Sequence, residues 1–408
     1  MFKKIIITLV LFISLVSIFS IYKLKHFNTK ELTNDVSNIG EDTKEEEIIK
    51  EENYKTTMIM AGDNLIHSSV YKDAYTNGSY DFKKMYELIK PIVSSYDIAY
   101  YNQETILGGT ELGVSDYPTF NSPQEVGDAM IDAGFNLVSL ATNHTMDKGE
   151  KAVVNSRNYW NSKSDVLAVG SYSSFQERDE VKIKEVNNIS YTMLNYTYGT
   201  NGMPVPSGKE YLVNVWPTDL YINDVNRDVI YQEYKEEVKK DIEAVRDSVD
   251  VLIVAMHWGV EYTHEPTAYQ KDMAQYLASL DVDIIIGTHP HVIQPIEWID
   301  DTLVIYSLGN LISAQYQDSN YNKMVGLMTS LEINKKVIGD DVIISIDNID
   351  NELIYTYYKN WRNFKVVPFS SREIGNYLSN YESVYQRYKD IVTMYDSNIF
   401  VKSLNKEV

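Results

Sequence analysis

From Thr56 onward, short apolar runs alternate with longer amphipathic segments, and this alternation constrains the fold more than any other feature. Six runs are predicted to be buried strands: Thr57–Ala61, Ile98–Tyr101, Leu137–Ala141, Val251–Met256, Asp283–Ile286 and Leu303–Tyr306. Four segments between them have helical periodicity: Phe82–Val93, Pro123–Ala133, Asp228–Val249 and Thr267–Leu280. Strands that alternate with helices predict an α/β fold in which helices cover a sheet.

Two other regions have a different pattern. Residues 181–222 and 324–357 alternate β-branched and aromatic side chains, which predicts antiparallel hairpins added to the sheet. The tail, residues 371–395, is predicted to be helical and is rich in tyrosine. The length of 408 residues, 44% of them apolar, fits one large domain or two modest ones. The absence of cysteine excludes disulfides, thiolate metal sites and a cysteine nucleophile.

The N-terminus has the pattern of a membrane anchor. Lysines flank an uncharged, mostly apolar stretch, Ile5–Tyr22, which as a helix would span about 27 Å. A cleaved signal peptide is the alternative, but it would have a shorter apolar core and a small-residue cleavage site. We therefore expect an anchor over residues 1–25 and a solvated acidic linker over residues 26–55.

The charge is distributed unevenly along the chain. Residues 1–30 hold five lysines and no acids, and residues 31–53 hold nine acids and two lysines, so the remainder carries most of the net charge of −21. A surface this acidic repels phosphate backbones, so we expect no nucleic-acid partner.

Histidines and carboxylates follow the predicted strands. In layered α/β folds, ligands bind beyond the carboxyl ends of strands, so this placement predicts a functional site. The residues placed in this way are Asp63, His67, Glu104, Asn143, His144, His257, Glu261, His289 and His291. At each single position, the alternative is an ordinary turn residue, a surface residue or a core residue with its hydrogen bonds satisfied.

Three of these positions carry a local argument. Gly62 permits a tight exit that presents the Asp63 carboxylate. His144 can donate a hydrogen bond or a proton. The alternative is that this segment has only a structural role, in which Asp147, three residues on, caps the following helix. Glu261 lies four residues beyond His257, on the same side if the chain stays extended.

The segment His289-Pro290-His291 is the strongest single signal. Proline pushes the preceding residue toward an extended conformation, and extended residues at i and i+2 point the same way. Two imidazoles aimed at one point predict a metal site. Carboxylates, a carboxamide and imidazoles without sulfur suit Mn, Fe, Zn or Mg. Two such cations, about 3.5–4 Å apart, can clamp an electrophile and generate hydroxide near neutral pH.

Taken in order, these motifs resemble the calcineurin-like metallophosphoesterases, and more closely the CapA/PgsA-type capsule synthesis proteins linked to poly-γ-glutamate. The resemblance covers roughly residues 57–312 and rests on six segments: Ala61-Gly62-Asp63, Asn102-Gln103-Glu104, Thr142–Gly149, His257–Tyr262, Gly287–Val292 and Tyr306–Asn310. It implies a four-layered α-β-β-α sandwich behind an N-terminal transmembrane helix, with the domain outside the cell. The metal ligands that it implies are Asp63, Glu104, Asn143, His257, His289 and His291.

The resemblance also implies that His144 stabilises the leaving group or transition state. Family members usually have leucine where Gln103 stands, asparagine where Thr142 stands and phenylalanine where Leu311 stands, and none of these departures removes a ligand. The wider class has an Asp-x-His first motif, whereas this chain has Leu65 in place of the histidine. One metal is therefore short of a ligand unless His67 supplies it.

Three functions remain open from the sequence. The first is synthesis or export of poly-γ-glutamate or a similar anionic capsule polymer at the cell membrane, with other capsule-synthesis membrane proteins as partners. The second is a secreted metallohydrolase that cleaves phosphoester or amide bonds of cell-wall polymers, with His144 or Glu261 handling protons. The third is a non-catalytic polymer-binding scaffold. In each, residues 56–365 form the metallophosphoesterase-type domain and residues 366–408 a C-terminal helical extension.

Overall fold

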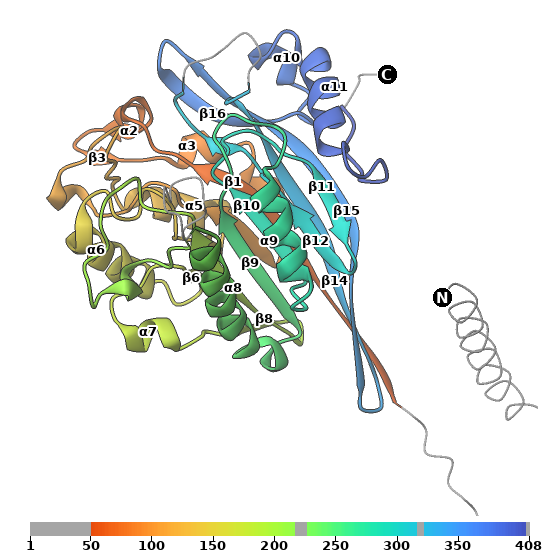
Figure 1. Cartoon of the computed structure of the whole chain (residues 1–408). Coiled ribbons are helices and arrows are strands. Elements are labelled where there is room, and N and C mark those ends of the chain that lie inside the picture. Colours follow the sequence, from red (N-terminus) through yellow and green to blue (C-terminus); the bar gives the residue numbers. More distant parts are fainter. Residues whose placement is uncertain (1–49, 217–226, 316–321, 405–408) are drawn as a thin grey trace, which may run out of the picture. The chain divides into compact units, whose positions relative to one another are not determined.

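The computed structural model describes residues 50–216, 227–315 and 322–404, in which two large β-sheets are accompanied by helices (Figure 1). The mixed α/β class expected from the sequence is confirmed. The predicted anchor and most of the predicted acidic linker lie outside the described residues. Within the described ranges, no helix is both long and apolar enough to cross a membrane.

The first sheet has the strand order β16-β15-β14-β1-β4-β5-β6, with β13 paired to the end of β1. Its centre is parallel, because β1 pairs with β4, β4 with β5 and β5 with β6 in the same direction. The strands are β1 (Glu51–Asn64), β4 (Ile98–Asn102), β5 (Leu137–Ser139), β6 (Leu167–Val169), β13 (Asn310–Ile312), β14 (Val325–Ile338), β15 (Asp341–Lys359) and β16 (Arg362–Pro368).

The second sheet has the order β11-β12-β10-β9-β8-β7. Its four inner strands are parallel, and an antiparallel strand closes each edge. The strands are β7 (Lys184–Val186), β8 (Ile189–Thr197), β9 (Val251–His257), β10 (Ile284–Thr288), β11 (Ile296–Ile299) and β12 (Thr302–Ile305). A separate two-stranded ribbon pairs β2 (Tyr75–Thr76) with β3 (Ser79–Tyr80).

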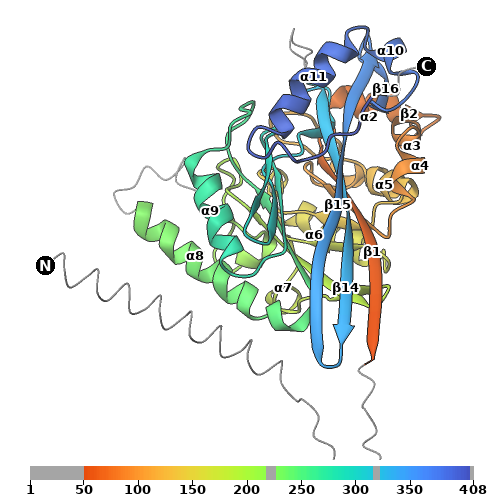
Figure 2. The ribbon, with the colours of Figure 1, turned by 90° about the vertical axis from the view of Figure 1, so that its right-hand side faces the viewer.

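Period-two alternation divides the strand side chains between cores. In β1, Met58 and Met60 join a large apolar cluster that also contains Ile253 of β9, whereas Ile59 and Ala61 point to a second cluster with the helices beside the first sheet. A third cluster joins the second sheet to α8 and α9. In Figure 2, α8 and α9 lie to the left of the strands, and α3, α4 and α5 lie to the right.

The helices are short and follow the strands that they cover. Their bounds are α2 (Ser68–Ala74), α3 (Lys83–Tyr86), α4 (Lys90–Val93), α5 (Glu125–Ala133), α6 (Gly149–Asn161), α7 (Phe175–Asp179), α8 (Arg227–Glu243), α9 (Ala268–Ala278), α10 (Ile374–Tyr377) and α11 (Tyr381–Val392). From α11, Val384 and Tyr388 reach the cluster that both sheets share. The C-terminal residues are therefore part of the folded core of the described unit.

Two segment predictions need correction. Phe82–Val93 forms two single-turn helices instead of one, because Pro91 fits the first turn of α4 but its ring would clash with a carbonyl inside a longer helix. In the described part of residues 181–222, which ends at residue 216, only β7 and β8 form an antiparallel hairpin, and β8 then pairs in parallel with β9. By contrast, β14 and β15 form the predicted hairpin over residues 325–359.

Candidate metal centre

The candidate centre lies where strands of both sheets end. In the first sheet, Asp63 at the end of β1 is in register with Asn102 at the end of β4. In the second sheet, His257 at the end of β9 is in register with Thr288 at the end of β10. Carboxyl ends of parallel strands collect at one edge, so residues far apart in sequence meet there.

The Asp63 carboxylate is fully buried and held from both sheets. Its Oδ1 accepts a hydrogen bond from Asn102 Nδ2 at 2.8 Å, and its Oδ2 accepts one from the His289 backbone N–H at 3.2 Å. Gly62 is needed before it, because a Cβ there would lie 1.8 Å from the Gly309 carbonyl oxygen. The sequence argument that Gly62 allows a tight exit is consistent with this close approach.

Glu104 follows β4 and is also fully buried, but neither of its carboxylate oxygens makes a hydrogen bond. Its Oε1 lies 3.5 Å from His291 Nε2 and 3.9 Å from His257 Nε2. Burial raises the pKa of Glu104 well above its usual range, although nearby His291 opposes the shift. A buried carboxylate without hydrogen bonds is costly, so a partner that neutralises it, such as a cation, fits this position.

His257 and Asn143 come together across the two sheets. His257 Nε2 lies 3.0 Å from Asn143 Oδ1, and His257 Nδ1 lies 3.0 Å from Thr288 Oγ1. Burial lowers the pKa of His257, and also that of His289, well below the usual range of histidine. Both imidazoles are thus held in the neutral form that binds metal ions.

His289 and His291 reach the centre by a different backbone route from the predicted one. Their φ angles are +92° and +58°, so neither is extended, and β10 has already ended at Thr288. Non-glycine residues in this region carry strain of about 1 kcal/mol or more. The prediction of two extended residues was wrong, because contacts of His291 with Asp63 and Asn310, at 3.2 and 3.0 Å, fix the turn instead.

Three overlapping sets of residues place one potential ligand atom each within 4.8 Å of the others. They are Glu104 with His257 and His289, Asp63 with Glu104 and His291, and Glu261 with His289 and His291. Oxygen and imidazole donors of this kind suit Mn, Fe, Zn or Mg. The residues present therefore fit a metal site, and the absence of any hydrogen bond to the two buried Glu104 oxygens is the observation that supports it.

His144 lies beside this centre and is oriented by Asp147. His144 Nδ1 lies 2.7 Å from Asp147 Oδ2, which also accepts a hydrogen bond from the Phe120 backbone N–H at 2.7 Å. The alternative of Asp147 as a helix cap is wrong, because α6 begins at Gly149 after Lys148 and has no side-chain cap. The carboxylate is committed to His144 and Phe120 instead.

A cleft of about 800 Å³ opens in front of His144. Tyr198 and Glu261 line it together with the loop of residues 199–203. Glu261 is exposed, and it approaches His289 and His291 through a turn in which Gly259 and Tyr262 have positive φ. The predicted extended path from His257 to Glu261 was therefore wrong, although Glu261 still reaches the site.

His67 is the one histidine among the predicted ligands that belongs to none of the three sets. Its Nδ1 accepts a hydrogen bond from the Ala314 backbone N–H at 3.2 Å, and its ring meets the edge of Phe120. Phe120 in turn contacts the His144 ring, with centroids 4.7 Å apart. His67 and His144 thus both contact Phe120, and the role of His67 as a ligand stays a prediction.

Sequence reasoning missed several residues that position the ligands. Tyr198 lies 4.5 Å from the His289 ring centre and stacks on His257, and Asn201 Oδ1 accepts a hydrogen bond from Asn143 Nδ2 at 3.3 Å. No local pattern could single them out within residues 181–222. Asn102 and Asn310 could have been found, because both follow strands inside motifs that the resemblance already included.

The sequence model of the bacterial capsule synthesis protein PGA_cap matches residues 57–315 of this chain. The capsule biosynthesis protein CapA of Bacillus anthracis is 25% identical over 267 residues, which are 65% of this chain and 61% of that protein. The PGA biosynthesis protein CapA of Bacillus subtilis (strain 168) is 29% identical over 185 residues, or 45% and 44% of the two chains. The matched part of this chain thus spans less than two thirds of either relative.

Solved structures are more distant. A putative 5'-nucleotidase from Staphylococcus aureus in complex with alpha-ketoglutarate has a TM-score of 0.42 and 15% identity, covering 82% of this chain and 58% of that one. GAP50, the anchor in the inner membrane complex of Plasmodium, has a TM-score of 0.32 and 10% identity, covering 86% and 98%. Both TM-scores are below 0.5, so neither similarity is used to assign a fold or a function to this protein.

Proposed function

This chain belongs to the bacterial capsule synthesis protein PGA_cap family, and we propose that it acts on an anionic capsule polymer through a metal-dependent, hydrolase-type site. The polymer class follows from the relatives, which are named for capsule and PGA biosynthesis. The site follows from this chain's own residues. The observation that carries the proposal is the buried Glu104 carboxylate, which has no hydrogen bond and faces three histidine rings.

Six residues would hold the metal in this proposal: Asp63, Glu104, Asn143, His257, His289 and His291. A divalent cation bound there would supply Lewis acidity and lower the pKa of its bound water toward neutral pH. The neighbours of the ligands fix their direction: Asn102 and the His289 N–H hold Asp63, and Thr288 holds His257. Such outer contacts orient ligands and raise metal affinity.

His144 is the proposed general acid, with Glu261 as a second group that can move protons. Asp147 holds the Nδ1 side of His144, and the ring lines the cleft, so its other nitrogen is available to a substrate there. A positioned histidine typically contributes about 10²- to 10⁴-fold to a rate. His144 donates to the leaving group, and Asp147 keeps the ring in the orientation that this step requires.

The architecture and location are also proposals. Helices beside each sheet and one apolar cluster shared by the sheets support a four-layered α-β-β-α sandwich. The apolar segment Ile5–Tyr22 supports a single-pass anchor in the cell membrane with the domain outside. There the site would meet the polymer and other capsule-synthesis membrane proteins.

The test is the metal content of the purified full-length chain, measured by elemental mass spectrometry, followed by hydrolysis of poly-γ-glutamate. We expect about one to two equivalents of metal in the parent, a large loss in Glu104→Gln, and retained metal with slow hydrolysis in His144→Asn. The exposed Glu373→Gln is the matched control and should behave as the parent. A parent chain that holds no metal when supplied with all four candidate ions would refute the proposal.

A further inference from the structure

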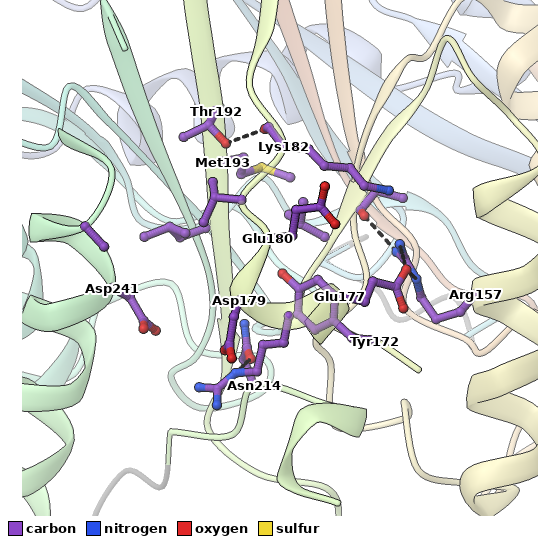
Figure 3. Close-up of a pocket in the computed structure, with 16 residues that line it drawn as sticks. Arg157, Tyr172, Glu177, Asp179, Glu180, Lys182, Thr192, Met193, Asn214 and Asp241 are labelled. Carbon is purple, nitrogen blue, oxygen red and sulfur yellow. Dashed lines mark hydrogen bonds and ion pairs between the residues drawn. The ribbon is translucent and has the colours of Figure 1, made fainter. Parts of the chain in front are cut away.

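One further cavity adjoins the cleft in front of His144, and a third cavity adjoins that one. The cleft shares Thr200, Gly202 and Met203 with a cavity of about 710 Å³. That cavity shares Arg178, Asn214 and Asp241 with a third one of about 230 Å³, shown in Figure 3. Three adjoining hollows therefore extend from the candidate metal centre, and Arg178 lies where the second meets the third.

The Arg178 side chain is fixed but its hydrogen-bonding capacity is largely unused. Its Nε donates to Asn214 Oδ1 at 2.9 Å, and Asn214 is itself anchored by donating to the Asn195 carbonyl at 3.1 Å. Within the described ranges, the two terminal nitrogens of Arg178 make no hydrogen bond or ion pair. A guanidinium held at Nε with its two outer nitrogens free is suited to bind a carboxylate by two parallel hydrogen bonds.

Arg157 lines the cavity of about 230 Å³ together with Arg178, and all three of its guanidinium nitrogens donate hydrogen bonds. It pairs with Glu177 and also donates to the Ala168 carbonyl and to Asn161. Figure 3 shows this pair on one side of the cavity and Asp241 on the other. Arg157 is thus a structural residue, and the contrast identifies Arg178 as the available one.

Six acidic residues also line the two cavities at Arg178, and two of them, Asp241 and Glu210, accept hydrogen bonds from other groups; the six are Glu177, Asp179, Glu180, Glu210, Glu237 and Asp241. Asp241 accepts a hydrogen bond from the Tyr196 hydroxyl at 2.8 Å, and Glu210 accepts one from the Gly208 N–H at 2.9 Å. Neither forms an ion pair with Arg178 among the described residues. The guanidinium therefore remains open to an outside carboxylate.

The cleft at the metal centre differs from these cavities in having no cationic side chain in its lining. Its lining includes Asp147 and Glu261 but no lysine or arginine. The loop that faces it presents small and neutral residues: Gly199, Thr200, Asn201 and Gly202. A neutral amide group suits this lining better than a free carboxylate, because the lining holds two acids and no lysine or arginine to offset them.

We propose that Arg178 is a carboxylate-binding subsite for the same polymer whose amide link lies in the cleft near His144. The inference rests on the proposed function for the class of polymer. A chain of γ-linked glutamates offers both groups, an amide for the cleft and a side carboxylate for Arg178 farther along. The subsite would hold long chains and leave very short ones unaffected.

Calorimetric binding of γ-linked glutamate oligomers to the full-length chain tests this. We expect oligomers of about ten residues to bind more tightly than oligomers of about two. Arg178→Gln should weaken binding of the longer oligomer by about 10- to 100-fold, the range for charged hydrogen bonds, and leave the shorter one unchanged. Arg178→Lys should recover part of the loss, and the exposed Arg372→Gln is the matched control.

The outcomes separate this subsite from the proposed function. Equal binding of the longer oligomer by the parent and Arg178→Gln would overturn the subsite, whether or not the chain hydrolyses anything. Equal weakening by Arg178→Gln and Arg372→Gln would also overturn it, because that result indicates general charge. If the chain binds the longer oligomer through Arg178 but holds no metal and hydrolyses nothing, the subsite is supported and the proposed hydrolase activity is refuted.

Discussion

Two glutamates of this protein, the half-buried Glu177 and the fully buried Glu104, have opposite environments. Glu177 receives hydrogen bonds from Arg157, Asn161 and Ser173, and these favourable contacts outweigh burial and hold its pKa at about 2. Glu104 has no hydrogen bond, and burial holds its pKa well above the usual range. A saturated buried charge indicates a structural role, whereas an unsaturated one indicates a place for a ligand.

The largest expected effect is on stability and comes from removing the partner of Glu177. Arg157→Met should lower the free energy of unfolding by about 3 kcal/mol or more, because it leaves the half-buried Glu177 without its counter-charge and the Ala168 carbonyl without its donor. Urea unfolding of the metal-free chain measures this. The double variant Arg157→Met with Glu177→Leu should recover most of the loss, and a single variant as stable as the parent would contradict the structural role.

The second prediction concerns Glu104 and metal binding. Glu104→Gln should reduce metal affinity by more than about 100-fold, the upper end of what loss of an outer-shell partner costs. In the metal-free form, the same change should leave the stability equal or higher, because it removes a fully buried carboxylate that makes no hydrogen bond and has only the His291 ring, at 3.5 Å, to offset its charge. Metal titration and thermal unfolding measure the two quantities. A Glu104→Gln chain that binds metal normally but unfolds easily would make Glu104 a structural residue.

A third prediction concerns pH. Because the folded-state pKa of Glu177 is lowered to about 2, its pair stabilises the fold fully above its unfolded pKa of about 4.5 and loses this contribution as pH falls toward 2. We expect the loss to be about 2 kcal/mol across that window. The difference in unfolding free energy between the parent and Glu177→Gln, measured at pH 6 and pH 3, isolates it. A difference that does not change with pH would contradict this account.

The smallest expected effect lies beside the metal centre. Asp147→Asn should slow the proposed hydrolysis by about 10-fold, because it weakens the contact that orients His144. Metal content should stay at the parent level, since Asp147 belongs to none of the three ligand sets. A shifted pH–rate profile in this variant would indicate that Asp147 acts through His144, whereas loss of metal would show that it supports the centre as a whole.

Sequence patterns were most successful where the signal is local. The six predicted strands correspond to β1, β4, β5, β9, β10 and β12, because apolar runs of this length bury in a sheet wherever it forms. The polar residues just after them are brought together because parallel strands end at one edge. Phe82–Val93 failed as one helix because a single proline outweighed its periodicity.

The α/β class, the family and most residues of the candidate centre could be inferred from the amino-acid sequence alone, because apolar periodicity and residues at strand ends are properties of short segments. The folded structure was needed to show that Glu104 has no hydrogen bond, that His289 and His291 have positive φ, and that Arg178 lies between two cavities. Each depends on contacts between distant segments, such as Asp63 with His289, 226 positions apart. Burial and hydrogen-bond saturation are properties of the packed sheets, so no short stretch of sequence can specify them.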